Sequence, residues 1–70
     1  MRGNELIRKI QCLAKKRGLM CWVNETRGKG SHVTLYLGSR VTILRNPKDE
    51  LKTGTLHAIC KQLGISRGDL

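Results

Sequence analysis

The sequence predicts one small α+β domain, with a three-stranded antiparallel sheet that carries both helices on one face, in the order α-β-β-β-α. The chain has 70 residues, which is enough for a single thin core. Apolar residues recur at helical spacing near both ends, whereas between them they alternate with polar residues as strands do. Alternation leaves one sheet face in water, so both helices are expected to cover the other face.

The first helix is expected between Asn4 and Gly18. Asparagine is a preferred N-cap residue, and glycine readily adopts the left-handed conformation that ends a helix. The apolar stripe of this helix comprises Leu6, Ile7, Ile10, Leu13 and Ala14.

Three strands are expected at residues 19–25, 31–37 and 40–44. A basic, glycine-spaced loop separates the first two, and Gly38-Ser39 forms a two-residue hairpin turn between the last two. One face of the second strand is apolar, with Val33, Leu35 and Leu37, and the other carries His32, Thr34 and Tyr36. In the third strand, Val41 and Ile43 are expected to face the core.

Asn46-Pro47 ends the third strand, and a polar loop leads to the second helix. This helix is expected to begin at Thr53 or Thr55 and to end at Leu63, before Gly64. Its core face comprises Leu56, Ile59 and Leu63, and residues 66–70 are expected to form a tail of the same domain.

The charge of the chain points to a polyanionic partner. Fourteen Lys and Arg against five Asp and Glu give a net charge of +9, and cations that neutralise phosphates add affinity for nucleic acid. A membrane partner is not expected, because the longest apolar run, residues 19–23, is far too short to span a bilayer. With only two aromatic residues, the chain is also not expected to enclose a pocket for an organic cofactor.

The three cysteines are widely spaced and include no C-x-x-C pair. Neither a zinc site nor a disulfide framework is therefore expected, and the thiols are interpreted as reduced in the cytoplasm. The segment after Met1 has no apolar stretch typical of an export signal.

Phosphate binding is expected in the loop and at the start of the second helix. Glycine-spaced backbone N–H groups and cations suit an anion, as does a helix N-terminus, and Tyr36 would stack a base. The alternative is that the loop is an ordinary hairpin connection and that Tyr36 is a plain surface residue. The candidate RNA-binding residues are Arg27, Lys29, Gly30, Ser31, Tyr36, Lys52, Thr53 and Thr55.

His32 is the candidate catalytic residue. RNA supplies its own nucleophile, the 2′-hydroxyl, so cleavage needs a base, an acid and positive charge at the phosphate, and imidazole exchanges protons near neutral pH. The alternative is that His32 is an inert surface histidine. Of the five carboxylates only Asp49 and Glu50 are adjacent, which does not favour a metal-dependent nuclease. His57 is expected to be a surface residue of the second helix.

Four segments resemble the HicA family of bacterial mRNA interferase toxins: residues 30–32 (GSH), 41–43 (VTI), 48–56 (KDELKTGTL) and 63–65 (LGI). The resemblance implies a fold like that of double-stranded-RNA-binding domains, RNA cleavage by the histidine that corresponds to His32, and a HicB-type antitoxin that covers the active site. Many members have a second histidine where this chain has Val33. The general acid is therefore open between Lys29, a water molecule and His32 itself.

Two functions follow from these observations. The first is a metal-independent endoribonuclease toxin that acts on mRNA through His32. The second is a module of the same shape that binds RNA without cleaving it, and DNA binding is a weaker third possibility.

Overall fold

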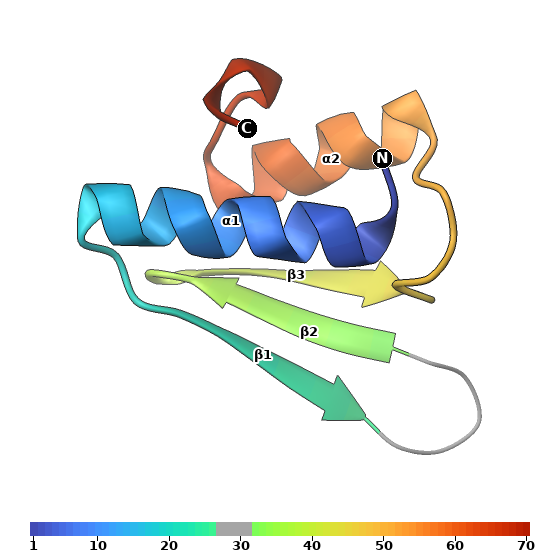
Figure 1. The fold of residues 1–70 in the computed structure, drawn as a ribbon, viewed down its shortest axis with the longest axis horizontal. Coiled ribbons are helices and arrows are strands. Elements are labelled where there is room, and N and C mark those ends of the chain that lie inside the picture. Colours follow the sequence, from blue (N-terminus) through green and yellow to red (C-terminus); the bar gives the residue numbers. More distant parts are fainter. Residues whose placement is uncertain (27–31) are drawn as a thin grey trace.

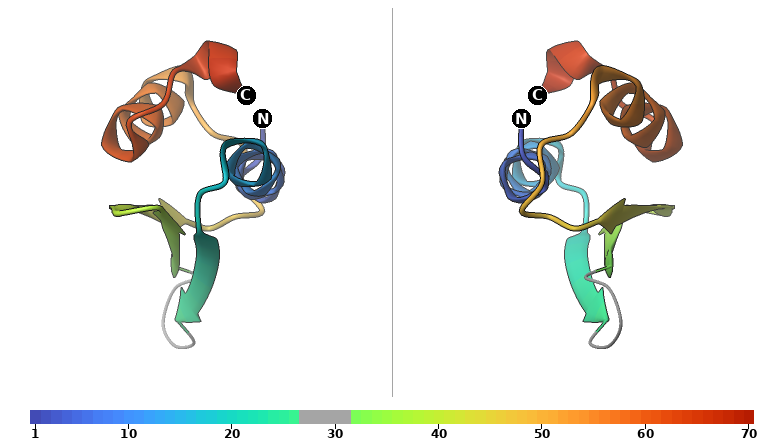
Figure 2. Two further views of the ribbon diagram at one scale, coloured as in Figure 1. Left: turned by 90° about the vertical axis from the view of Figure 1, so that its left-hand side faces the viewer. Right: turned by 90° about the vertical axis from the view of Figure 1, so that its right-hand side faces the viewer.

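A computed structural model of the chain describes residues 1–26 and 32–70 and has the predicted element order. The elements are α1 (Gly3–Arg17), β1 (Cys21–Thr26), β2 (His32–Leu37), β3 (Arg40–Arg45), α2 (Thr53–Leu63) and a short 3-10 helix, η1 (Arg67–Asp69). The strands form one antiparallel sheet in the order β1-β2-β3. Both helices lie on the same side of this sheet (Figures 1 and 2), so the predicted fold class is confirmed.

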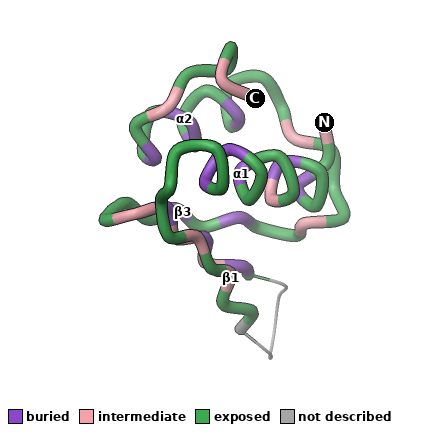
Figure 3. Tube along the Cα trace, turned by 60° about the vertical axis from the view of Figure 1, so that its left-hand side comes forward, coloured by how far each residue is buried: buried purple, intermediate pink, exposed green. Residues whose placement is uncertain are grey.

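The core lies between the helices and the sheet, where the purple segments of the tube face one another (Figure 3). Its largest fully buried side chains come from α1 and from the two strands beneath the helices, namely Leu6, Ile10, Leu35 and Leu44. Leu56, Ile59 and Leu63 of α2 complete it, as the helical spacing predicts. The opposite face of the sheet is left without a covering element among the described residues.

The start of α1 differs from the sequence prediction. The helix begins at Gly3, and Asn4 does not cap it; instead the backbone N–H of Asn4 donates to the carbonyl oxygen of Pro47 at 2.8 Å. The loop after β3 thus accepts a hydrogen bond that a side-chain cap would otherwise accept. A Cβ at Gly3 would lie 2.7 Å from the Cα of Pro47, so this close approach requires glycine. The contact holds the loop that leads to α2 against α1.

The inward face of β3 also differs from the prediction. Val41 and Ile43 are 49% and 62% exposed, whereas Thr42 and Leu44 are 3% and 1% exposed. The two-residue turn pairs Leu37 with Arg40 and therefore Tyr36 with Val41. Because directly paired residues lie on the same face of a sheet, Val41 and Ile43 must share the outer face with Tyr36 and Thr34. The hydroxyl of Thr42, turned inward, donates to Oε1 of Gln62 on α2.

The residues after α2 pack back onto the domain. Ile65 and Leu70 contact the core, and Arg17 at the end of α1 forms an ion pair with Asp69 at 3.0 Å. The backbone N–H of Ser66 donates to the Asp69 carboxylate, and this hydrogen bond, reinforced by Arg17, lowers the carboxyl pKa below its ordinary value. None of the described helices is long and apolar enough to cross a membrane.

Candidate functional site

The outer face of the sheet, on the side away from the helices, is organised in cross-strand rows. One row joins Trp22, Tyr36 and Val41, and the next joins Asn24, Thr34 and Ile43. A further row pairs His32 on β2 with Arg45 on β3. Since paired residues share a face, His32 and Arg45 are neighbouring positions on the side of the sheet that the helices leave open.

His32 is the first residue of β2 and is exposed, so its ring is available to a ligand. The residue after it, Val33, is 3% exposed and belongs to the core. Val33 therefore anchors the start of β2 in the core, while its neighbour His32 faces solvent. The predicted exposure of His32 on the open face is found in the structure.

Arg45 is a residue that the strand-by-strand sequence analysis missed. It lies one position beyond the third strand expected from the sequence, but it belongs to β3 and pairs with His32. The signal was present in the sequence: counting outward from the turn at Gly38-Ser39 pairs position 32 with position 45. A cation next to a histidine can stabilise the negative charge that develops on a phosphate during its reaction.

Arg45 also lines a groove between the edge of β3 and α2, with a volume of about 500 Å³. Two of the predicted RNA-binding residues, Lys52 and Thr55, line the same groove. Lys52 occupies the N-cap position of α2 without a side-chain cap hydrogen bond, and Thr53 is the first helical residue. The structure thus connects the start of α2 to the His32 row through Arg45, although His32 does not itself line the groove.

Asp49 and Glu50 also line this groove, and carboxylates oppose the binding of an anion. Both are engaged in contacts of their own. The Glu50 carboxylate pairs with the N-terminal ammonium of Met1, and the Asp49 carboxylate accepts a hydrogen bond from the Asn46 side chain at 3.0 Å. These contacts reduce the repulsion that a phosphate in the groove would meet.

Tyr36 lies on the same face as His32, four residues further along β2. Its ring stacks on that of Trp22 with a centroid separation of 4.9 Å and an angle of 24° between the planes. Tyr36 was predicted from the sequence but Trp22 was not, because only the register of β1 and β2 shows that the two residues are partners.

The candidate residues Arg27, Lys29, Gly30 and Ser31 lie outside the described part of the chain.

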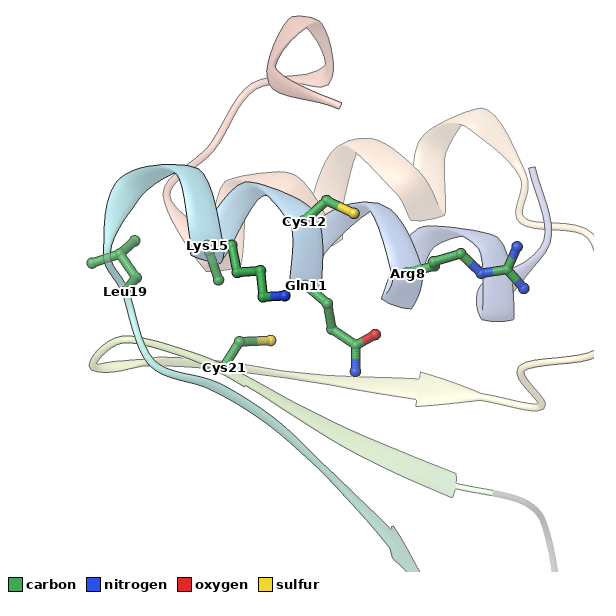
Figure 4. Close-up of a pocket in the computed structure, with 7 residues that line it drawn as sticks. Arg8, Gln11, Cys12, Lys15, Leu19 and Cys21 are labelled. Carbon is green, nitrogen blue, oxygen red and sulfur yellow. The ribbon is translucent and has the colours of Figure 1, made fainter.

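A second groove, of about 460 Å³, opens between α1 and β1 and is lined by Arg8, Gln11 and Lys15 among others (Figure 4). It lies on the helix side of the sheet, away from the His32 row. Within residues 1–26 and 32–70, no three His, Cys, Asp or Glu side chains come together as a metal site would require.

Two of the three cysteines take part in packing, whereas Cys12 is exposed. Cys60 is 2% exposed and belongs to the core, and Cys21 packs against this core. Burial raises the pKa of both thiols, which disfavours the reactive thiolate.

Comparison with known protein families places most of this site within a family. Residues 22–65, which cover β2, β3, α2 and all but the first residue of β1, match the family model of the HicA toxin of bacterial toxin-antitoxin systems. No curated protein and no solved structure matches the chain.

Proposed function

The chain belongs to the HicA family of toxins of bacterial toxin-antitoxin systems, and from this premise we propose that it cleaves RNA with His32 as its catalytic residue. Family membership also implies an antitoxin partner. The observation that carries the catalytic assignment is the position of His32, exposed on the open sheet face and paired across the strands with Arg45.

The proposed reaction is an internal transesterification. The 2′-oxygen of a ribose attacks the adjacent phosphorus while the bond from phosphorus to the 5′-oxygen breaks, which leaves a 2′,3′-cyclic phosphate and a 5′-hydroxyl. One group removes the proton from the 2′-hydroxyl and another delivers a proton to the leaving 5′-oxygen. His32 carries at least one of these transfers, and Arg45 stabilises the charge on the phosphorane.

Phosphates on either side of the cleaved bond are proposed to contact the remaining cations and amides. Lys52 and Thr55 line the groove that Arg45 shares, and Thr53 is the first residue of α2. Arg27, Lys29, Gly30 and Ser31, which immediately precede His32 in the sequence, are also proposed to bind phosphates of the RNA backbone.

The purified protein is expected to cleave a labelled mRNA fragment in excess EDTA and to leave cyclic phosphate ends. A fragment with 2′-O-methyl groups throughout should remain intact, because its nucleophile is blocked. Binding without cleavage of any unmodified RNA, at any protein excess, would support the binding-only alternative. Cleavage that EDTA abolishes and Mg²⁺ restores would contradict the metal-independent mechanism.

Replacing Arg45 with glutamine is expected to lower the cleavage rate at least about tenfold, because it removes a cation from the reacting phosphate. It should also reduce the salt dependence of RNA binding by roughly 0.7 in the logarithmic slope, the value for one phosphate contact on a single strand. Arg40→Gln is the matched control, since Arg40 is on the same strand but at its opposite end, beside Gly64. Equal effects of the two substitutions on rate and slope would refute the role of Arg45.

The antitoxin is proposed to be of HicB type and to cover the open sheet face around His32. A partner with an acidic surface would complement the net charge of +9 and associate quickly through long-range attraction.

A further inference from the structure

Both aromatic residues of this chain lie on the open sheet face and outside the core. The chain has one Trp, one Tyr and no Phe, and its core is built from aliphatic side chains and one cysteine. Trp22 is 47% exposed, and the apolar residues beside this aromatic pair, Val41 and Ile43, are exposed as well. Such a cluster of exposed apolar side chains on a small domain marks an interaction surface.

We propose that the aromatic pair, Trp22 and Tyr36, is a stacking site for a base of single-stranded RNA. The pair would hold the substrate on the same sheet face as His32, at the other end of β2. This inference rests on the proposed function, in that the strand it binds is the one that His32 cleaves. The two rings are already stacked at 4.9 Å. Trp22 is on β1, an edge strand, so a base can extend the stack on the outer face of the indole without displacing Tyr36.

The distance between the two sites suits one continuous strand. Tyr36 and His32 are four residues apart on β2, which corresponds to about 13 Å along a strand. The base on the outer face of Trp22 lies one to two strand spacings of about 4.8 Å beyond β2. A stacked nucleic-acid strand advances about 3.4 Å per nucleotide, so the stacked base and the cleaved linkage would be separated by at most about five nucleotides. The aromatic pair would therefore set where the cut falls relative to an unpaired base.

The row between the two sites is suited to contacts with the same strand. Asn24 is exposed and Thr34 is half-buried, and the two are direct partners on β1 and β2. An amide and a hydroxyl can bond base edges or the 2′-hydroxyl groups of an RNA strand. The open face thus offers stacking, hydrogen bonding and the His32–Arg45 pair in succession.

The charge of the domain favours nucleic acid over an apolar protein partner as the occupant. The net charge of +9 attracts phosphates to the domain as a whole, and stacking on aromatic rings is the usual way in which basic proteins hold unpaired bases. A duplex would be a poorer ligand here, because its bases already stack on each other.

The single tryptophan makes the test direct, because all indole fluorescence comes from Trp22. We expect an eight-nucleotide 2′-O-methyl RNA, which cannot be cleaved, to quench this fluorescence as it binds. An oligomer with the same backbone but abasic at every position should bind more weakly and leave the fluorescence unchanged. The same sequence annealed to its complement should quench less at equal concentration.

Trp22→Leu is expected to weaken binding of the fluorescein-labelled eight-nucleotide strand by roughly 5- to 150-fold, the range for one stacked base. Trp22→Phe should restore most of the affinity. The matched control is Met20→Leu, which alters a 70% exposed apolar residue outside the aromatic pair and should bind like the wild type. Thermal melting of each variant reports whether the domain is intact, and Tyr36→Leu, which keeps the indole, tests the pair by quenching if Trp22→Leu does not fold.

The outcomes separate this inference from the proposed function. Quenching by the 2′-O-methyl strand without cleavage of unmodified RNA would support the stacking site and contradict the nuclease. Cleavage of RNA with no quenching, and with unchanged affinity in folded Trp22→Leu, would overturn the stacking site alone. If folded Trp22→Leu loses binding to its antitoxin but keeps full RNA affinity, the face is a protein-docking surface and the inference is wrong.

Discussion

Replacing His32 with alanine is expected to slow RNA cleavage by at least about 10²-fold, and by 10⁴-fold or more if the imidazole serves in both proton transfers. RNA affinity and the melting temperature should change little, because the side chain is exposed and contributes nothing to the core. The measurements are initial rates on an unmodified fragment, binding of its 2′-O-methyl counterpart, and a melting curve for the same preparation.

His57→Ala is the matched control for this experiment. His57 is the only other histidine of the chain, and it is exposed on α2, not on the open sheet face. It should retain the wild-type rate and, when expressed without antitoxin, should still arrest growth and deplete mRNA. If His32→Ala cleaves as fast as His57→Ala, His32 is not catalytic and the binding-only alternative stands.

The size of the His32→Ala effect also bears on the general acid. If a different group delivers the proton to the 5′-oxygen, the variant keeps that part of the catalysis, and an RNA with a better leaving group should recover little of the lost rate. If His32 acts in both steps, an activated leaving group removes the need for the acid and recovers part of the rate. Lys29→Ala, measured on the same two substrates, distinguishes the lysine from a water molecule.

Local sequence signals located most of the fold correctly because the structures they describe are local. Gly18 and Gly64, with φ of 65° and 71°, end the two helices where the sequence predicts. The alternation in β2 correctly placed three residues in the core and His32 outside it. The start of α1 was wrong because the loop that accepts its backbone hydrogen bonds lies more than forty residues away in the sequence.

Only about half of the candidate site was predictable from the sequence. His32 and Tyr36 were found because they lie on one strand, and strand alternation is read from a single segment. Arg45 and Trp22 were missed because each joins the site through pairing with another strand. The apolar residues of β3, taken alone, predicted that Val41 and Ile43 face inward. The two-residue turn before β3 already specified the opposite face.

Two neighbouring substitutions in β3 test that register directly, and they have opposite expectations. Leu44→Ala removes a side chain that is 1% exposed and should lower the free energy of unfolding by about 2–5 kcal/mol, the usual cost of such a cavity. A domain of this size has only about 5–15 kcal/mol to lose. Ile43→Ala truncates a side chain that is 62% exposed, so its cost should stay below about 1 kcal/mol, which is the range of strand propensity.

Urea unfolding of the two variants, analysed with the same dependence of the free energy of unfolding on urea concentration, shows which of the two side chains faces the core. The result reaches beyond stability, because a shift of one residue turns every side chain of a strand to the opposite face. If Ile43→Ala were the more damaging variant, Arg45 would point toward the helices and not toward His32. The proposed site would then lose its second half, and the exposed apolar patch beside the aromatic pair would lose its explanation.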